Sequence, residues 1–237
     1  MNARVEHDRT SPHAYREATV QGTLLWAAVA VWFAEFVLIP MRSRVWFPDW
    51  PGTINPFLWW TTGLVASWVI VPAIILRREG PLPFSIALPR TMRGIALYGA
   101  IIAIMAPAVY IASLRGDFTN TYPLFKPIDG WSWPLLLGYW TCYAAILFCT
   151  EFFFRGVLLF SLESRLGLSA IGVSVIPYCL IHAHKPLPEA FGSIIAGLVL
   201  GWLALRTRSI GGGVLVHCAV AIGMDALALI GRGGLPA

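Results

Sequence analysis

Four residues in the second half of the chain could do chemistry together: Glu151, Arg155, His182 and His217. Each lies inside or at the end of a long apolar run, where charged and titratable side chains are costly and usually functional. Glu151 and Arg155 are four residues apart, so on a helix they share one face and can form an ion pair. A carboxylate and two imidazoles can activate water, transfer protons and stabilise an oxyanion. We therefore expect the four residues to converge on one hydrolytic site.

The predicted roles follow from these side chains. Glu151 is expected to be the base that activates water, while His182 shares the water or carries its proton. His217 is expected to donate to the oxyanion. Structural alternatives remain open, because Glu151 and Arg155 could form only a structural ion pair, and His182 could be a histidine at a helix end.

Two further residues are candidates for supporting roles. Thr150 directly precedes Glu151, although a threonine within a helix often bonds to its own backbone. Asp225 lies two helical turns after His217 on the same apolar segment. The three phenylalanines at 152–154 are expected to face lipid.

The composition places the chain in a membrane. Of 237 residues, 57% are hydrophobic and 12% are charged, and the mean hydropathy is +0.70, which is more apolar surface than a soluble domain could bury. The net charge of +5 comes from basic residues that cluster between the apolar runs. This distribution suits contact with anionic lipid headgroups and argues against a nucleic-acid partner.

The apolar runs predict an all-α, polytopic transmembrane helix bundle with about seven crossings, within a range of six to eight. The crossings are expected over residues 22–41, 57–76, 94–114, 133–161, 168–182, 189–205 and 210–230. We divide the chain into a polar N-terminal segment (1–20), N-terminal helices and loops (21–130), a catalytic-type core (131–231) and a C-terminal tail (232–237).

The distribution of Arg and Lys predicts the orientation. With the N-terminus inside, the cytoplasmic segments hold ten basic residues, Arg4, Arg9, Arg16, Arg77, Arg78, Arg90, Arg93, Arg165, Arg206 and Arg208. The opposite side holds six, Arg42, Arg44, Arg115, Lys126, Lys185 and Arg232. We therefore predict an integral protein of the bacterial inner membrane with a cytoplasmic N-terminus.

Three short motifs in this order resemble those of the CAAX prenyl endopeptidase and bacteriocin-processing family of intramembrane proteases. They are Thr150-Glu151-Phe152-Phe153-Phe154-Arg155-Gly156, Tyr178-Cys179-Leu180-Ile181-His182 and His217-Cys218-Ala219-Val220-Ala221. The family patterns are Glu-Glu-x-x-x-Arg, an aromatic residue followed by His four positions later, and His-x-x-x-Asn. The resemblance covers roughly residues 133–226.

Two positions depart from the family patterns. Thr150 stands where the family has the first glutamate, to which water activation is usually assigned, and Ala221 stands where it has asparagine. The single glutamate is also similar to the sorting-type branch called myxosortases. The site could therefore be rebuilt around Glu151 and Asp225, or its activity could be reduced or lost.

The resemblance implies an intramembrane endopeptidase that uses glutamate-activated water and no cofactor. Its substrates would be membrane-associated or C-terminally anchored proteins, including lipidated peptides. Two alternatives stay open: a catalytically inactive scaffold or bacteriocin-immunity factor, and a zinc hydrolase with Glu151, His182 and His217 as ligands.

Overall fold

The computed structural model describes residues 22, 25–34, 54–78, 80–127, 129–233 and 235. The predicted polar segment 1–20 lies outside these residues, and of the first predicted crossing only part is described, as a helix over 25–34. The described part of the chain is built from helices, with one isolated bridge between Ser85 and Ser209. The predicted all-α class is confirmed.

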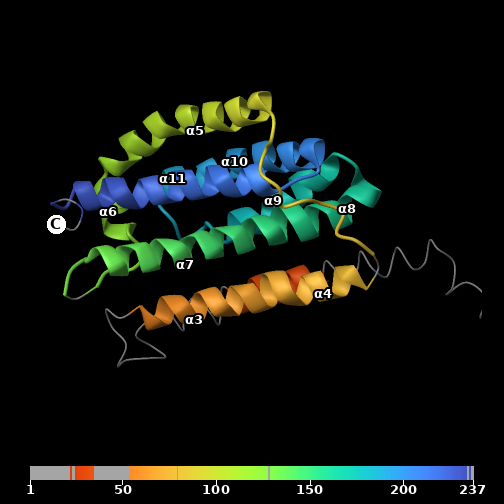
Figure 1. The fold of residues 1–237 in the computed structure, drawn as a ribbon, viewed down its shortest axis with the longest axis horizontal. Coiled ribbons are helices and arrows are strands. Elements are labelled where there is room, and N and C mark those ends of the chain that lie inside the picture. Colours follow the sequence, from red (N-terminus) through yellow and green to blue (C-terminus); the bar gives the residue numbers. More distant parts are fainter. Residues whose placement is uncertain are drawn as a thin grey trace, which may run out of the picture.

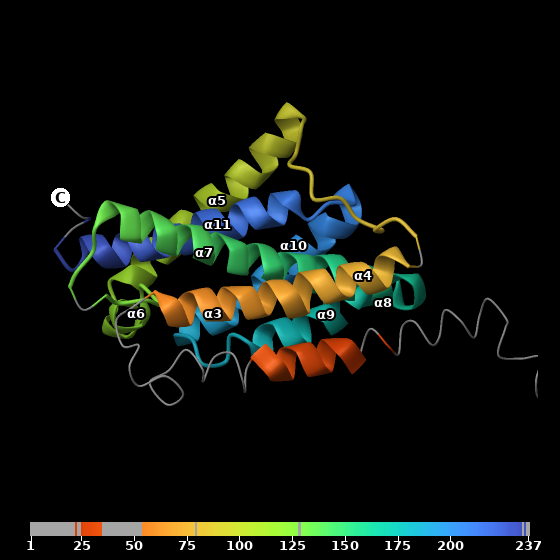
Figure 2. The same cartoon turned by 60° about the horizontal axis from the view of Figure 1, so that its bottom comes forward.

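A long central helix organises the bundle (Figures 1 and 2). It runs through α7 (Trp133–Glu151), the π-helical segment η3 (Phe152–Leu158) and α8 (Leu159–Leu166). Pro134 lies in its first turn, where the missing N–H costs nothing. Because apolar residues surround this helix on every side, it is buried among its neighbours for most of its length.

The other helices pack around the central one. On one side lies the helix formed by α3 (Asn55–Leu64), η2 (Val65–Ile70) and α4 (Val71–Arg77). On the other side α11 (Gly211–Ile230) packs between α7 and the outer helix α5 (Met92–Ser113), which is followed by the short α6 (Gly116–Thr121). The antiparallel pair α9 (Ser169–Leu180) and α10 (Leu187–Thr207) completes the described bundle.

Within the described residues, five helices are long and apolar enough to cross a membrane: Asn55–Arg78, Met92–Ser113, Trp133–Leu166, Leu187–Thr207 and Gly211–Ile230. Helix α9 is apolar but shorter. Together with the first predicted crossing, these helices fit a bundle of about seven crossings. The connection between the third and fourth predicted crossings contains the short helix α6.

Small residues allow α9 and α10 to pack closely. A Cβ atom on Gly197 would lie 2.8 Å from Val175, and one on Gly201 would lie 3.0 Å from Ile171. Gly192, Ser193, Gly197 and Gly201 form a series of small residues on α10, a pattern typical of close helix contacts in membranes.

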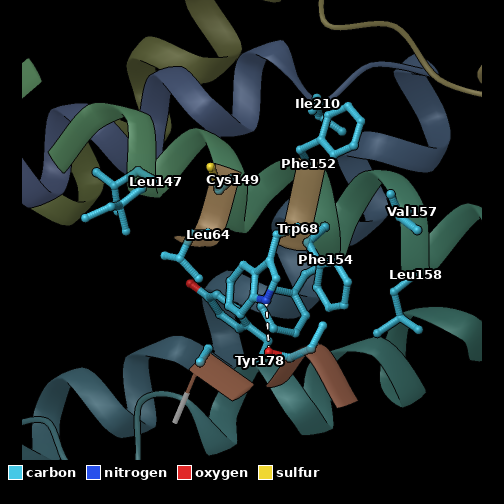
Figure 3. Packing of buried hydrophobic residues seen from close by; sticks show 14 of the residues in the cluster. Leu64, Trp68, Leu147, Cys149, Phe152, Phe154, Val157, Leu158, Tyr178 and Ile210 are labelled. Carbon is cyan, nitrogen blue, oxygen red and sulfur yellow. Dashed lines mark hydrogen bonds between the residues drawn. The ribbon is translucent and has the colours of Figure 1, made fainter. Parts of the chain in front are cut away.

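The phenylalanine run at 152–154 lies in the core and does not face lipid, so that expectation was wrong. Phe153 and Phe154 are fully buried. Trp68 from η2 stacks on Phe153 with the ring centroids 5.0 Å apart. It also meets Phe154 edge-on (Figure 3). The Trp68 indole N–H also donates to the Ala30 carbonyl at 3.1 Å. Neighbouring helices cover all faces of this segment, which a local sequence pattern does not reveal.

The segment before α5 closes one end of the bundle. Phe84 stacks on Phe160 and lies directly over Gly156, where an added Cβ would be 2.5 Å from its ring. Two backbone hydrogen bonds join this segment to the start of α11. The Ser85 carbonyl accepts from the Ile210 N–H, and the Ser85 N–H donates to the Arg208 carbonyl. Because Gly156 has no side chain, the Phe84 ring can pack directly against its backbone. This contact is the physical reason for a glycine after Arg155.

Candidate active site

Glu151 is the centre of the candidate site. It ends α7, and its side chain is fully buried. Its Oε1 atom lies 2.9 Å from Nδ1 of His217 on α11 and 3.2 Å from Nη1 of Arg155 one turn along its own helix. The predicted convergence of these three side chains is present in the structure. A buried carboxylate needs such partners, because an unpaired charge away from water is very costly.

Arg155 is held between the carboxylate and an aromatic ring. Its side chain is 3% exposed, and its guanidinium carbon lies 3.7 Å from the centroid of the Tyr178 ring on α9. A desolvated cation over an aromatic face is an attractive arrangement. The aromatic position of the second motif therefore has a structural reason, which the motif spacing alone did not provide.

The first residues of α11 are glycines, and their backbone approaches the Glu151 carboxylate closely. A Cβ atom at Gly213 would lie 2.8 Å from Oε2 of Glu151, and one at Gly212 would lie 2.0 Å from the Tyr98 ring on α5. Larger residues here would push α11 away and separate His217 from Glu151. Sequence reasoning did not assign these glycines a role, although the run 211–213 at the start of an apolar segment was a visible signal.

The two histidines differ in their contacts. His217 is 15% exposed, and its Nδ1 atom faces Glu151, which leaves Nε2 as its other polar atom. His182 follows α9, and its Nδ1 atom lies 2.8 Å from the Tyr178 carbonyl oxygen. Since a carbonyl can only accept, Nδ1 of His182 carries the proton and Nε2 has the free lone pair. Tyr178 lies between the two imidazoles, with its ring centroid 4.6 Å from His182 and 6.3 Å from His217.

Both imidazoles line one cavity of about 620 Å³. Its polar walls near the site come from Thr150, Tyr178, His182 and His217, and most of the remaining wall is apolar. The apolar part is formed mainly by α5, α10 and α11, including Ile104, Met105, Leu200, Val216 and Val220. Glu151 and Arg155 do not reach this cavity and lie behind its wall.

The two supporting candidates lie in different places. Thr150 donates from Oγ1 to the Ile146 carbonyl at 2.9 Å, so its hydroxyl is used within its own helix, while the residue still lines the cavity. Asp225 is fully buried, and Tyr139 and Trp140 lie near its carboxylate. It follows His217 by eight residues, roughly 12 Å along a helix axis. The structure therefore does not bring Asp225 to Glu151.

The zinc alternative would use Glu151, His182 and His217 as ligands. Among the described residues, no group of three or more His, Cys, Asp or Glu side chains is close enough to hold a metal ion. Glu151 Oε1 is already held by Arg155 and His217. In this arrangement the Glu151 carboxylate is paired with Arg155 and His217.

These contacts define a carboxylate and imidazole pair beside a cavity that joins two histidines, and the three motifs lie within one stretch of the chain. Residues 131–223 match the Rce1-like family of type II CAAX prenyl endopeptidases. The match includes Glu151, Arg155, His182 and His217 and ends before Asp225. The predicted family resemblance is therefore confirmed over this Rce1-like region. Searches among curated proteins and solved structures gave no significant match.

The apolar helices indicate an integral membrane protein, and residues 131–223 are similar to CAAX-protease-like peptidases. The region begins just before α7 and ends on α11, so it contains every helix that contributes a side chain to the Glu151 cluster. The helices that precede it supply part of the cavity wall.

Proposed function

We propose that the protein is an intramembrane endopeptidase that hydrolyses peptide bonds of membrane-associated or C-terminally anchored proteins. The observation that carries this proposal is the 2.9 Å contact between Glu151 Oε1 and His217 Nδ1 beside the cavity. A buried carboxylate that orients an imidazole is a recurrent arrangement in hydrolases, where the second ring nitrogen accepts a proton from the nucleophile.

Water can be activated in two ways at such a site. Glu151 could remove the proton directly, as the motif resemblance implies, or it could act through His217. The contacts favour the second route, because Oε1 of Glu151 is already held and Oε2 faces the backbone of Gly213. With Nδ1 of His217 donating to Glu151, Nε2 carries the lone pair that takes the proton from water.

The other polar residues complete the proposed mechanism. His182 has a free lone pair on Nε2 and accepts the second hydrogen of the water, which orients its oxygen toward the scissile carbonyl. The protonated His217 then donates to the leaving amine, as general acid catalysis requires. Arg155 keeps Glu151 ionised, so that the imidazolium formed during the reaction is stabilised.

The proposed substrate follows from the cavity walls. An apolar cavity with polar groups at one place suits a chain segment that adjoins a membrane anchor, either a transmembrane helix or a lipid. We also propose a bacterial inner-membrane location with a cytoplasmic N-terminus, since the basic residues are more numerous on that side.

The test is cleavage of a membrane-anchored reporter by purified protein in lipid nanodiscs. We expect His217→Ala and His182→Ala to lose activity, and a chelator to leave the activity of the wild type unchanged. Undiminished cleavage by both histidine variants would rule out the proposed site. Loss of activity with chelator, restored by Zn²⁺, would instead favour the zinc alternative.

A non-catalytic role makes a different prediction. A Glu151→Gln variant keeps the shape of the side chain and removes its charge. If this variant fully restored the phenotype of a deletion strain, the protein would act as a scaffold or immunity factor. The proposed peptidase function requires that Glu151→Gln does not restore the phenotype.

A further inference from the structure

At one end of the bundle lie the segment 80–91, α8 and the start of α11, and at the other end lie α6 and the turn between α9 and α10 (Figure 1). The residues that line the cavity include Arg115, Asp117, Lys185 and Glu189 from the second end and, among the described residues, none from 80–91 or from α8. We call the first end closed and the second end open. Because the central helix and α11 run between these ends, the ends correspond to the two sides of a membrane.

Tight packing closes the first end. Phe84 fills the space over Gly156. A Cβ atom added to Gly211 would lie only 2.3 Å from the Ala87 carbonyl oxygen, so the two backbones are in close contact. Ser209 donates from its hydroxyl to the Ala87 carbonyl at 2.7 Å. Among the described residues, none from 69–100 and none from 201–215 lines the cavity. Within the part of the chain that the structure describes, the cavity that holds the histidines therefore does not extend to this side.

Charged and polar side chains form the rim of the open end. Arg115 and Asp117 pair at 3.1 Å with about half of each side chain exposed, and both line the cavity. Lys185 lies 3.8 Å from Glu189 and donates to the Tyr122 hydroxyl at 3.0 Å, and that hydroxyl also bonds to Glu189. Charged groups at membrane depth pair with one another or face water, and the pairing and partial exposure of these side chains suit a cavity mouth that water reaches.

The two ends also differ in basic residues. In the described residues, seven arginines lie near the closed end: Arg77, Arg78, Arg90, Arg93, Arg165, Arg206 and Arg208. Four basic residues lie near the open end: Arg115, Lys126, Lys185 and Arg232. Short cytoplasmic loops carry the excess of Lys and Arg. The closed end is therefore the cytoplasmic one.

We infer that the active site opens to the extracytoplasmic side of the membrane and takes exported or membrane-anchored proteins whose scissile bond lies on that side. This inference rests on the proposed peptidase function for its substrate class, whereas the direction of the opening rests on packing and charge. The rim at Arg115, Asp117, Lys185 and Glu189 is then the place where a polar peptide segment enters, while its anchor stays in the lipid.

Cysteine accessibility in intact cells tests the direction of the opening. The four native cysteines, Cys142, Cys149, Cys179 and Cys218, are free and are first replaced by alanine. Single cysteines are then introduced as Asn120→Cys near the open end and Ala221→Cys inside the cavity. The matched control is Arg90→Cys, an exposed position near the closed end. The reagent is a membrane-impermeant thiosulfonate.

We expect Asn120→Cys and Ala221→Cys to react in intact cells and Arg90→Cys to react only after lysis. Reaction of Arg90→Cys in intact cells, or protection of both other positions until lysis, would overturn the inference. If the cysteine-free protein fails to fold, a phosphatase fused to the end of the full wild-type chain gives a second reading. We expect the phosphatase to be active, because this end of the chain should lie outside the cytoplasm. An inactive phosphatase, together with fluorescence from a cytoplasm-dependent fluorescent protein fused at the same position, would overturn the orientation.

A pair of reporters separates this inference from the proposed activity. Each has one transmembrane helix and the same candidate cleavage segment, placed outside the membrane in one and inside the cytoplasm in the other. We expect only the outer segment to be cut. Cleavage of the inner segment alone would overturn the inference, whereas cleavage of neither, with the expected labelling, would count against the peptidase function and leave the direction of the opening supported.

Discussion

At the scale of single residues, the candidate site was predicted as far as motif spacing allowed. The ion pair of Glu151 and Arg155 follows from a four-residue separation on one helix. The contact with His217 followed from the order of the motifs. Contacts that cross between helices without a motif were missed, such as Gly213 against Glu151. A glycine in an apolar run does not show which distant side chain lies over it.

Removing the negative charge of Glu151 should remove most of the activity. In Glu151→Gln the amide no longer stabilises an imidazolium at His217, and it can turn its NH₂ group toward Nδ1. We expect kcat to fall by about 10² to 10⁴-fold with little change in KM, the range typical of general acid and base assistance. Cleavage kinetics in nanodiscs measure both constants.

The matched control is Glu163→Gln, the same change at an exposed ion pair with Arg208. It should retain the wild-type kcat. Equal losses in the two variants would show that Glu151 has no special part in the reaction.

The buried ion pair also makes a prediction about stability. Arg155→Met leaves the Glu151 carboxylate buried without its cationic partner, and loss of one partner of a buried pair typically costs about 3 to 5 kcal/mol. The double variant with Glu151→Gln removes both charges and should be more stable than Arg155→Met alone. Unfolding in a mild detergent, followed by tryptophan fluorescence, tests the order. A double variant that is less stable than Arg155→Met would contradict the pairing.

At the scale of helices, the boundaries followed closely from the lengths of the apolar runs. The predicted segments 94–114 and 210–230 correspond to Met92–Ser113 and Gly211–Ile230. The sequence did not predict the π-helical segment Phe152–Leu158, because hydropathy does not distinguish one helical hydrogen-bond pattern from another. Nor does the sequence place Phe84 in the core, since the segment 82–93 is too short to cross a membrane and has no apolar pattern that predicts burial.

The contact between Phe84 and Gly156 can be tested by a rescue. In Gly156→Ala the added methyl group meets the Phe84 ring, and overpacking of this kind costs about 1 to 3 kcal/mol. Combining it with Phe84→Leu should recover part of the loss, because a smaller and more flexible side chain makes room. Thermal unfolding of the single and double variants in detergent gives the comparison.

Gly172→Ala is the control for this rescue, because a Cβ at this position on α9 meets nothing within 4 Å. It should be neutral or slightly stabilising. If Gly156→Ala behaved in the same way, Phe84 would not pack on this glycine as described.

At the scale of the whole molecule, the Rce1-like region depends on helices that precede it. Trp68 stacks on Phe153, Tyr98 covers Gly212, and Phe84 covers Gly156. The predicted division at residue 131 follows the motifs, which lie in one half of the chain. Stability is shared more widely, since side chains from both halves form one core around the central helix.

Separating the halves should therefore abolish folding. We expect residues 131–237 expressed alone to be degraded or aggregated, and co-expression with residues 1–130 to recover some folded protein. Size-exclusion profiles in detergent distinguish these outcomes. The point variant Trp68→Ala should lower the free energy of unfolding of the full chain by about 3 to 5 kcal/mol, as for large core truncations. A monodisperse, active fragment 131–237 would show that the region is self-sufficient.

The aromatic stack of Phe84 and Phe160 has an electrical consequence for the cell. In the proposed peptidase, water in the cavity would reach Thr150 and His217 within the hydrocarbon layer, so less apolar material would separate the two sides of the membrane there. Every 100 mV across a membrane is worth about 2.3 kcal/mol per elementary charge. Phe84 and Phe160 lie outside the lining of the cavity, and in the proposed peptidase they would form part of the barrier that keeps protons from crossing the membrane.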